Sequence, residues 1–190
     1  MKQNNSRVLL LCTLLILVAV ISRILNAELH WYNFTPIIAI SLFSGAVLKN
    51  KSITYLLPLA AYLISDIYIQ LTAGAGFYGI SQFFVYGAMA LVVLLGTSMR
   101  KPGVLHILGY SIGGTLLFWL ISNFGVFLGG YWGTGISGLA KTYYMALPFL
   151  TKDGTNLFFN SLVGTLICSG VLFGAFALLK SKVSPQKSLA

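Results

Sequence analysis

The chain has 190 residues, of which 57% are hydrophobic and only 8% charged, and its mean hydropathy is +0.88. A typical soluble domain carries about a quarter charged residues, so this composition excludes a water-soluble globule. Three acidic residues stand against twelve Lys and Arg. The basic residues form short clusters between long apolar runs, which is typical of a membrane protein and argues against a nucleic-acid partner.

Six apolar stretches are long enough to cross a bilayer, whose hydrocarbon core of about 30 Å needs roughly 20 residues of helix. Inside lipid the backbone must satisfy its own hydrogen bonds, so runs of this length are expected to be helical. The sequence therefore predicts an all-α, polytopic membrane protein in which residues 1–190 form a single transmembrane domain. The expected helices cover residues 8–25, 32–48, 53–71, 78–99, 104–128 and 155–179.

The distribution of Lys and Arg predicts the orientation of this bundle. With a cytoplasmic N-terminus, nine of them lie inside and three outside, the asymmetry expected of cytoplasmic loops. Both termini are therefore predicted to be cytoplasmic. The inside group is Lys2, Arg7, Lys49, Lys51, Arg100, Lys101, Lys180, Lys182 and Lys187, and the outside group is Arg23, Lys141 and Lys152.

The N-terminal stretch also resembles a secretory signal peptide, with Lys2 and Arg7 before the apolar run and a cleavage site after Ala27. Leu25 occupies the position where a small residue is wanted, and Arg23 interrupts the approach. We therefore favour a retained first helix. Cleavage would leave five helices and an N-terminus outside.

Asp66 is the one carboxylate expected within the membrane, about two-thirds of the way along the third helix towards the outside. A charge at this depth normally faces the bundle interior and finds a partner. Arg23 ends the first helix at a similar depth, so the sequence predicts an Arg23–Asp66 ion pair. The pair either contributes to function or only joins two helices. Tyr62 shares the helix face of Asp66, because the two are four residues apart.

Further polar side chains are expected at the same outer level. Asn33, Gln82, Asn123 and Asn160 come from four other helices. Each one alone is explained by hydrogen bonding between helices, worth roughly 0.6 kcal/mol. Their convergence at one depth favours a ligand site.

Residues 129–154 form a long outer connection between the fifth and sixth helices. Ile136, Leu139, Ala140 and Tyr143 follow the spacing of an amphipathic helix. A short helix here, together with Trp132, could cover a pocket or could lie at the membrane interface, where aromatic residues are favoured.

Catalytic machinery is not evident. His30 and His106 fall on opposite sides of the membrane, and Asp66 has no second carboxylate nearby for acid–base chemistry. No phosphate-binding glycine loop is present, so ATP hydrolysis by this chain is not expected. The sequence therefore predicts neither an enzyme nor a cofactor.

Three stretches together resemble an uncharacterised family of small bacterial integral-membrane proteins, over roughly residues 20–175. They are Asn33-Phe34-Thr35-Pro36-Ile37, Leu57-Pro58-Leu59 leading to Ser65-Asp66, and Asn123-Phe124-Gly125-Val126-Phe127. The resemblance implies a multi-pass protein of the bacterial inner membrane.

The helix number and topology are also similar to those of the substrate-binding components of energy-coupling-factor transporters, an analogy of architecture. Those components bind vitamins or metals from outside and use a transmembrane coupling subunit and ATPase subunits as partners. The Ala-x-x-x-Ala docking pattern usual on their first helix is missing here, where only Cys12, Ala19 and Ser22 are small.

We therefore hypothesise a subunit that binds a small polar or vitamin-like solute from the outer side. Two alternatives stay open: a solitary permease with Asp66 as a proton-coupled switch, and a non-catalytic structural or assembly protein. The candidate ligand-binding residues are Asp66, Asn123, Asn160, Gln82, Arg23, Asn33, Tyr62, Trp132 and Tyr143.

Overall fold

The computed structural model describes residues 5–29, 33–74, 76–100, 102–147 and 156–183. Within these residues the chain forms seven helices and no strand, which confirms the all-α prediction for this part of the chain. The helices are α1 (Asn5–Leu29), α2 (Ile37–Val47), α3 (Lys51–Ala73), α4 (Ile80–Thr97), α5 (Val104–Leu128), α6 (Gly135–Met145) and α7 (Leu157–Val183).

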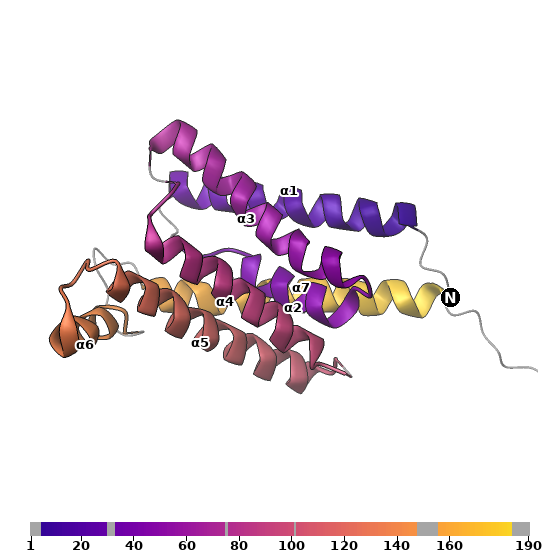
Figure 1. The fold of residues 1–190 in the computed structure, drawn as a ribbon. Helices are drawn as coiled ribbons and strands as arrows, with labels where there is room; N and C mark the ends of the chain where they lie inside the picture. The colour runs from indigo at the N-terminus through magenta and orange to yellow at the C-terminus, as the bar shows by residue number, and fades with distance from the viewer. Residues whose placement is uncertain (1–4, 30–32, 75, 101, 148–155, 184–190) are drawn as a thin grey trace, which may run out of the picture.

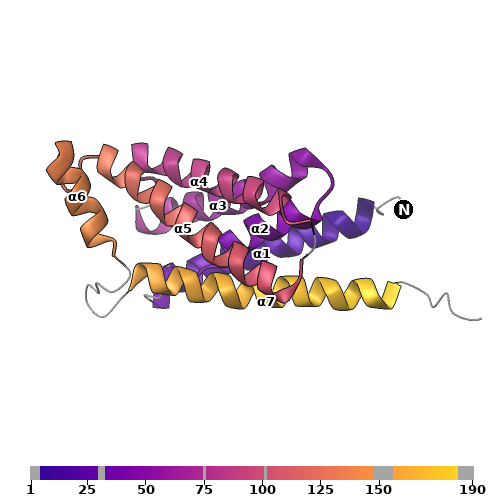
Figure 2. The same ribbon diagram turned by 90° about the horizontal axis from the view of Figure 1, so that it is seen from below.

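The long helices lie side by side along one elongated bundle (Figures 1 and 2). Helix α1 begins and α7 ends at the same end of this bundle, which we call the terminal end. The turn between α3 and α4 lies at the opposite end together with α6, and we call this the α6 end (Figure 1).

Among the residues that the structure describes, four helices are long and apolar enough to cross a membrane: α3, α4, α5 and the part of α7 from Leu157 to Leu178. The apolar stretches of α1 and α2 are shorter, at Leu10–Asn26 and Ile37–Val47. The prediction of six spanning helices is therefore confirmed for four of them by length and composition. Residues 32 and 155, where two of the predicted spans begin, lie outside the described residues.

The structure corrects the predicted helix 32–48, because α2 begins only at Ile37 and has 11 residues. At 1.5 Å per residue it is about 17 Å long, roughly half the thickness of a hydrocarbon core. Pro36 precedes the helix and disfavours a helical backbone at Thr35. Asn33 adopts a left-handed conformation with φ of 65°. The chain therefore enters the bundle as a non-helical segment, and α2 starts inside it (Figure 1).

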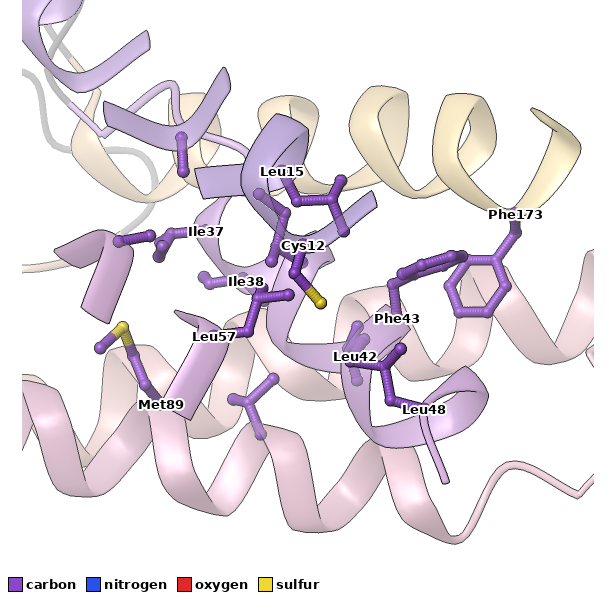
Figure 3. Close-up of a cluster of buried hydrophobic side chains, with 14 of the residues drawn as sticks. Cys12, Leu15, Ile37, Ile38, Leu42, Phe43, Leu48, Leu57, Met89 and Phe173 are labelled. Carbon is purple, nitrogen blue, oxygen red and sulfur yellow. The ribbon is translucent and has the colours of Figure 1, made fainter. Parts of the chain in front are cut away.

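Helix α2 forms the centre of the bundle. Its residues from Ile37 to Gly45 are all buried, and it packs against α3, α4, α5 and α7. Figure 3 shows its side chains within an apolar cluster to which α1 contributes Cys12 and Leu15 and α7 contributes Phe173. The phenyl ring of Phe43 meets the ring of Phe173 edge-on, with centroids 5.3 Å apart.

Helices α2 and α4 approach each other most closely at two glycines. A methyl group added at Gly45 would overlap the carbonyl oxygen of Val93, and one added at Gly96 would overlap the carbonyl oxygen of Leu42. Small residues permit such close backbone approach between membrane helices. The two glycines therefore fix how deeply α2 sits against α4.

Helix α6 occupies the connection between α5 and α7, where the sequence predicts a short helix. Its buried positions are Gly138 and Thr142, whereas Ile136 is 88% exposed. The face turned towards the bundle therefore leaves Ile136 outside, whereas Leu139 and Tyr143 of the predicted face are half-buried. Gly138 is buried because its Cα lies against the backbone of Gly133, where a side chain would not fit.

Candidate functional site

The predicted ion pair between Arg23 and Asp66 is confirmed. Nη1 of Arg23, near the end of α1, lies 2.8 Å from Oδ1 of Asp66 on α3. The Asp66 side chain is 0% exposed and that of Arg23 is 12% exposed. A buried pair of this kind is held in place by the cost of leaving either charge unpaired.

The second carboxylate oxygen of Asp66 accepts hydrogen bonds from two side chains of α4. Oδ2 accepts a hydrogen bond from Nε2 of Gln82 at 3.0 Å and another from the hydroxyl of Tyr86 at 2.8 Å. Together with Arg23, these contacts join α1, α3 and α4 through one carboxylate. Asp66 is thus enclosed by protein groups and lines none of the cavities described below.

Arg23 makes further contacts with the α3 face that carries Asp66. Its Nη1 donates to the carbonyl oxygen of Tyr62 at 3.0 Å and to Oγ of Ser65 at 2.6 Å. Its guanidinium carbon lies 3.6 Å from the centroid of the Tyr62 ring, a cation–π contact. Arg23 also lines the smaller of the two cavities described below.

Tyr62 and Tyr78 place two phenol groups beside this network, with their hydroxyl oxygens 3.1 Å apart. Tyr78 lies in the turn before α4. Burial, and then the neighbouring Tyr62, raise the pKa of Tyr78 well above its ordinary value, so the phenol stays protonated. Both tyrosines line the large cavity described below, where their hydroxyl groups can meet a ligand.

A cavity of about 420 Å³ lies at the α6 end, and we call it the large cavity. It is bounded mainly by α5 and α7, with the end of α6 over it. Its polar groups alternate with aromatic rings, a composition typical of small-molecule sites. The lining residues are Asn33, Tyr62, Tyr78, Val85, Thr115, Phe118, Trp119, Ser122, Asn123, Val126, Met145, Ala146, Leu147, Leu157, Phe158 and Ser161.

A second cavity of about 170 Å³, the small cavity, lies beside Arg23 and the first residues of α2. Its other polar lining residues are Asn26, Asn33, Thr35, Tyr62 and Ser161. Four residues line both cavities, so the two spaces adjoin: Asn33, Tyr62, Phe118 and Ser161.

Helix α6 is fastened over the large cavity by hydrogen bonds to α5. Nε1 of Trp119 donates to the carbonyl oxygen of Ala146 at 2.8 Å, and the hydroxyl of Tyr143 donates to the carbonyl oxygen of Leu120 at 2.7 Å. The rings of Trp119 and Tyr143 also meet edge-on at 5.5 Å. The cover over this cavity is thus attached through backbone carbonyl groups.

The structure brings together some of the nine predicted ligand-binding residues and separates others. Arg23, Asn33, Tyr62 and Asn123 line one or both cavities. Asp66 and Gln82 lie in the hydrogen-bonded network behind Tyr62. The remaining three, Asn160, Trp132 and Tyr143, do not line either cavity.

Trp132 and Tyr143 make their contacts outside the two cavities. The Trp132 ring lies against Tyr131, with centroids 5.1 Å apart, and the Lys141 ammonium group lies 5.3 Å from the Trp132 centroid. Tyr143 holds α6 to α5, as described above. Direct contact of all nine residues with a ligand stays a prediction.

Several lining residues were not among the predicted ones, notably Tyr78, Trp119, Ser122 and Ser161. Trp119 shares a helix face with Asn123, and this spacing could have identified it. Ser122 and Ser161 are ordinary residues within apolar helices, so the sequence carries no signal that separates them from other serines. Among the described residues, no three His, Cys, Asp or Glu side chains cluster as metal ligands would.

Comparison with known proteins identifies the chain at the level of its family. A search of curated proteins found no match, and a search of solved structures found none either. Residues 2–187 match the profile of DUF6580, a family of unknown function, and this match covers nearly the whole sequence. The chain therefore belongs to the DUF6580 family, as its resemblance to an uncharacterised family predicted.

Proposed function

We propose that this protein is a membrane-embedded subunit that captures a small polar or vitamin-like solute in the large and small cavities. The observation that carries the proposal is the large cavity of about 420 Å³ between α5 and α7. Ligand sites are concave, largely apolar and equipped with a few converging polar groups. The large cavity has this composition, and Arg23 supplies a positive charge in the adjoining small cavity.

Arg23 supports a solute that carries a carboxylate or a similar acidic group. It is the one charged residue among the described residues that line either cavity. A guanidinium offers five N–H donors in a planar fork, which suits a carboxylate. The rings of Phe118, Trp119 and Phe158 line the adjoining large cavity and would accept the apolar or aromatic body of the same molecule.

The distribution of basic residues supports capture from the outside. Arg23 and Lys141, assigned to the outer side, belong to the last turns of α1 and to α6, which lie at the α6 end (Figure 1). Lys49, Lys51 and Arg100 lie at or next to the start of α3 and the end of α4, which are at the terminal end. With the terminal end in the cytoplasm, the large cavity faces outwards. The proposed location is the bacterial inner membrane, with the binding site towards the exterior.

The enclosure of Asp66 by protein groups favours a solute-binding subunit over a permease in which Asp66 acts as a proton-coupled switch. Arg23 pairs with one carboxylate oxygen, and Gln82 and Tyr86 donate to the other. These three partners hold the carboxylate in one position, whereas a switch has to exchange its partners. Energy for uptake would then come from a transmembrane coupling subunit and its ATPase subunits, as in the transporters of similar architecture.

Native mass spectrometry of the detergent-purified protein tests this proposal by looking for a co-purified small molecule. We expect one acidic molecule to be retained by the wild type and by Trp132→Phe, which changes a tryptophan outside both cavities. Ser161→Phe fills the space shared by the two cavities and should abolish retention. A folded wild-type protein that retains no molecule from a native membrane extract, or a Ser161→Phe variant that retains it fully, contradicts the proposal.

A further inference from the structure

Three buried hydroxyl groups on α5 and α7 have no hydrogen-bond partner. They are the side chains of Ser111, Thr165 and Ser169, each 0% exposed. The other fully buried hydroxyl groups of the described residues have partners, mostly within their own helices. Ser41, for example, donates to the carbonyl oxygen of Ile37 at 2.8 Å. Nearly all buried polar groups in proteins are paired with protein or with ordered water, so three exceptions on one pair of helices need an explanation.

The three hydroxyl groups lie between two spaces that α5 and α7 both line. One is the large cavity. The other is an open, mainly apolar groove at the terminal end, with a volume of about 1030 Å³, which we call the terminal groove. Its lining includes Arg100 and His106. Helices α5 and α7 are in contact between the two spaces, and Figure 2 shows α5 crossing over α7.

The helical register places the hydroxyl groups on the strip that connects these spaces. On α5, Leu108 lines the terminal groove and Thr115 lines the large cavity, and Ser111 lies between them at spacings of three and four residues. Residues at these spacings share one face of a helix. Ser111 therefore lies on this face of α5 between the terminal groove and the large cavity.

The same register holds on α7. Ser161 lines the large cavity, and Thr165 and Ser169 follow it at intervals of four residues. Phe173 follows Ser169 at the same interval and lines the terminal groove. The hydroxyl strip of α7 therefore ends at the terminal groove.

We infer that the interface between α5 and α7 is a hydrated seam, in which bound water satisfies these three hydroxyl groups and connects the large cavity with the terminal groove. Buried water typically makes about three hydrogen bonds to otherwise unsatisfied polar groups, and these hydroxyl groups supply such partners. Polar groups at membrane depth are tolerated where they line a water-filled space. The inference goes beyond capture and does not depend on the identity of the solute.

Cysteine accessibility tests the seam without any solute. In a background with Cys12→Ala and Cys168→Ala, the variants Ser111→Cys, Thr165→Cys and Ser169→Cys are treated with the water-borne reagent 2-aminoethyl methanethiosulfonate. Ser41→Cys and Ser44→Cys are matched controls, since both serines are equally buried but donate within α2. Only a hydrated thiol ionises readily, so the seam variants should react roughly tenfold faster or more than the controls. Equal rates overturn the inference.

Removal of the hydroxyl groups gives a second measurement that needs no reactive thiol. If Ser111, Thr165 and Ser169 were dry and unpaired, then Ser111→Ala, Thr165→Val and Ser169→Ala would each raise the unfolding temperature, because an unsatisfied buried group is removed. With water in the seam, the unfolding temperature should stay the same or fall. A rise in all three variants overturns the inference, whatever is found for solute capture.

Discussion

The guanidinium of Arg23 and the carboxylate of Asp66 form a buried ion pair whose Nη1–Oδ1 distance is 2.8 Å. The two residues are 43 positions apart in the sequence and belong to α1 and α3, whose packing they join. The same guanidinium lies over Tyr62 and lines the small cavity. The pair therefore links the fold of the bundle to the geometry of the candidate site.

Breaking this pair from one side should destabilise the protein strongly. We expect Asp66→Asn or Arg23→Gln each to lower the free energy of unfolding by about 3–5 kcal/mol, because a buried charge loses its partner. The double variant should lose less than the sum of the two. Reversible unfolding in mixed detergent micelles measures this, with Gln82→Ala as a milder comparison, since Tyr86 still donates to Asp66. Additive losses would show that the two charges are not coupled.

Asn33 allows the site to be altered without disturbing the backbone. Its φ of 65° suits asparagine and glycine, and its side chain lines both cavities. Asn33→Gly should therefore fold like the wild type and retain less solute. Asn33→Ala should also be less stable, by about 1–2 kcal/mol, because a Cβ is strained in this conformation. Thermal unfolding and native mass spectrometry separate the two effects, and a Gly variant less stable than the Ala variant would contradict this explanation.

The glycine contact between α2 and α4 should tolerate no side chain. Gly96→Ala would force a methyl group against the backbone of Leu42, so we expect a loss of about 1–3 kcal/mol in the free energy of unfolding. Gly87→Ala is a matched control on the same helix, because nothing lies within 4 Å of its added methyl group. The control should be neutral or slightly stabilising. Equal effects of the two substitutions would indicate that α2 can move away from α4 at no cost.

Trp119 should report occupation of the large cavity. In a variant with Trp31→Phe and Trp132→Phe, Trp119 is the remaining tryptophan, and its emission should change when the co-purified solute is added back to stripped protein. A variant with Trp31→Phe and Trp119→Phe leaves Trp132, which lies outside both cavities, and its emission should stay constant. A response only from Trp132 would place the solute outside the large cavity.

The residues that could be placed from the sequence are those with a strong energetic constraint. A buried carboxylate needs a partner, and this alone identified Arg23 as the partner of Asp66. The lengths of apolar runs located α3, α4, α5 and α7 for the same reason, since a span must match the bilayer. The predicted bounds of α5 agree with the observed ones, and those of α3, α4 and α7 differ by two to four residues.

The start of α2 and the cavity wall could not be placed in this way. The mainly apolar run extends from residue 32 to residue 48 without interruption. It therefore gives no sign that Pro36 and the left-handed backbone of Asn33 delay the start of the helix. The large cavity arises because α5 and α7 diverge towards the α6 end, and this depends on packing between helices that are distant in the sequence (Figure 2). Ser122 and Ser161 become lining residues only through that divergence.

The shortness of α2 has a consequence for how the protein is made. An eleven-residue segment is too short for an independent span, and α2 obtains its surroundings from four neighbouring helices, three of which follow α3 in the chain. We therefore expect α2 to reach its final position only after α4, α5 and α7 have been synthesised. Substitutions at its contacts should then reduce the yield of assembled protein in the membrane.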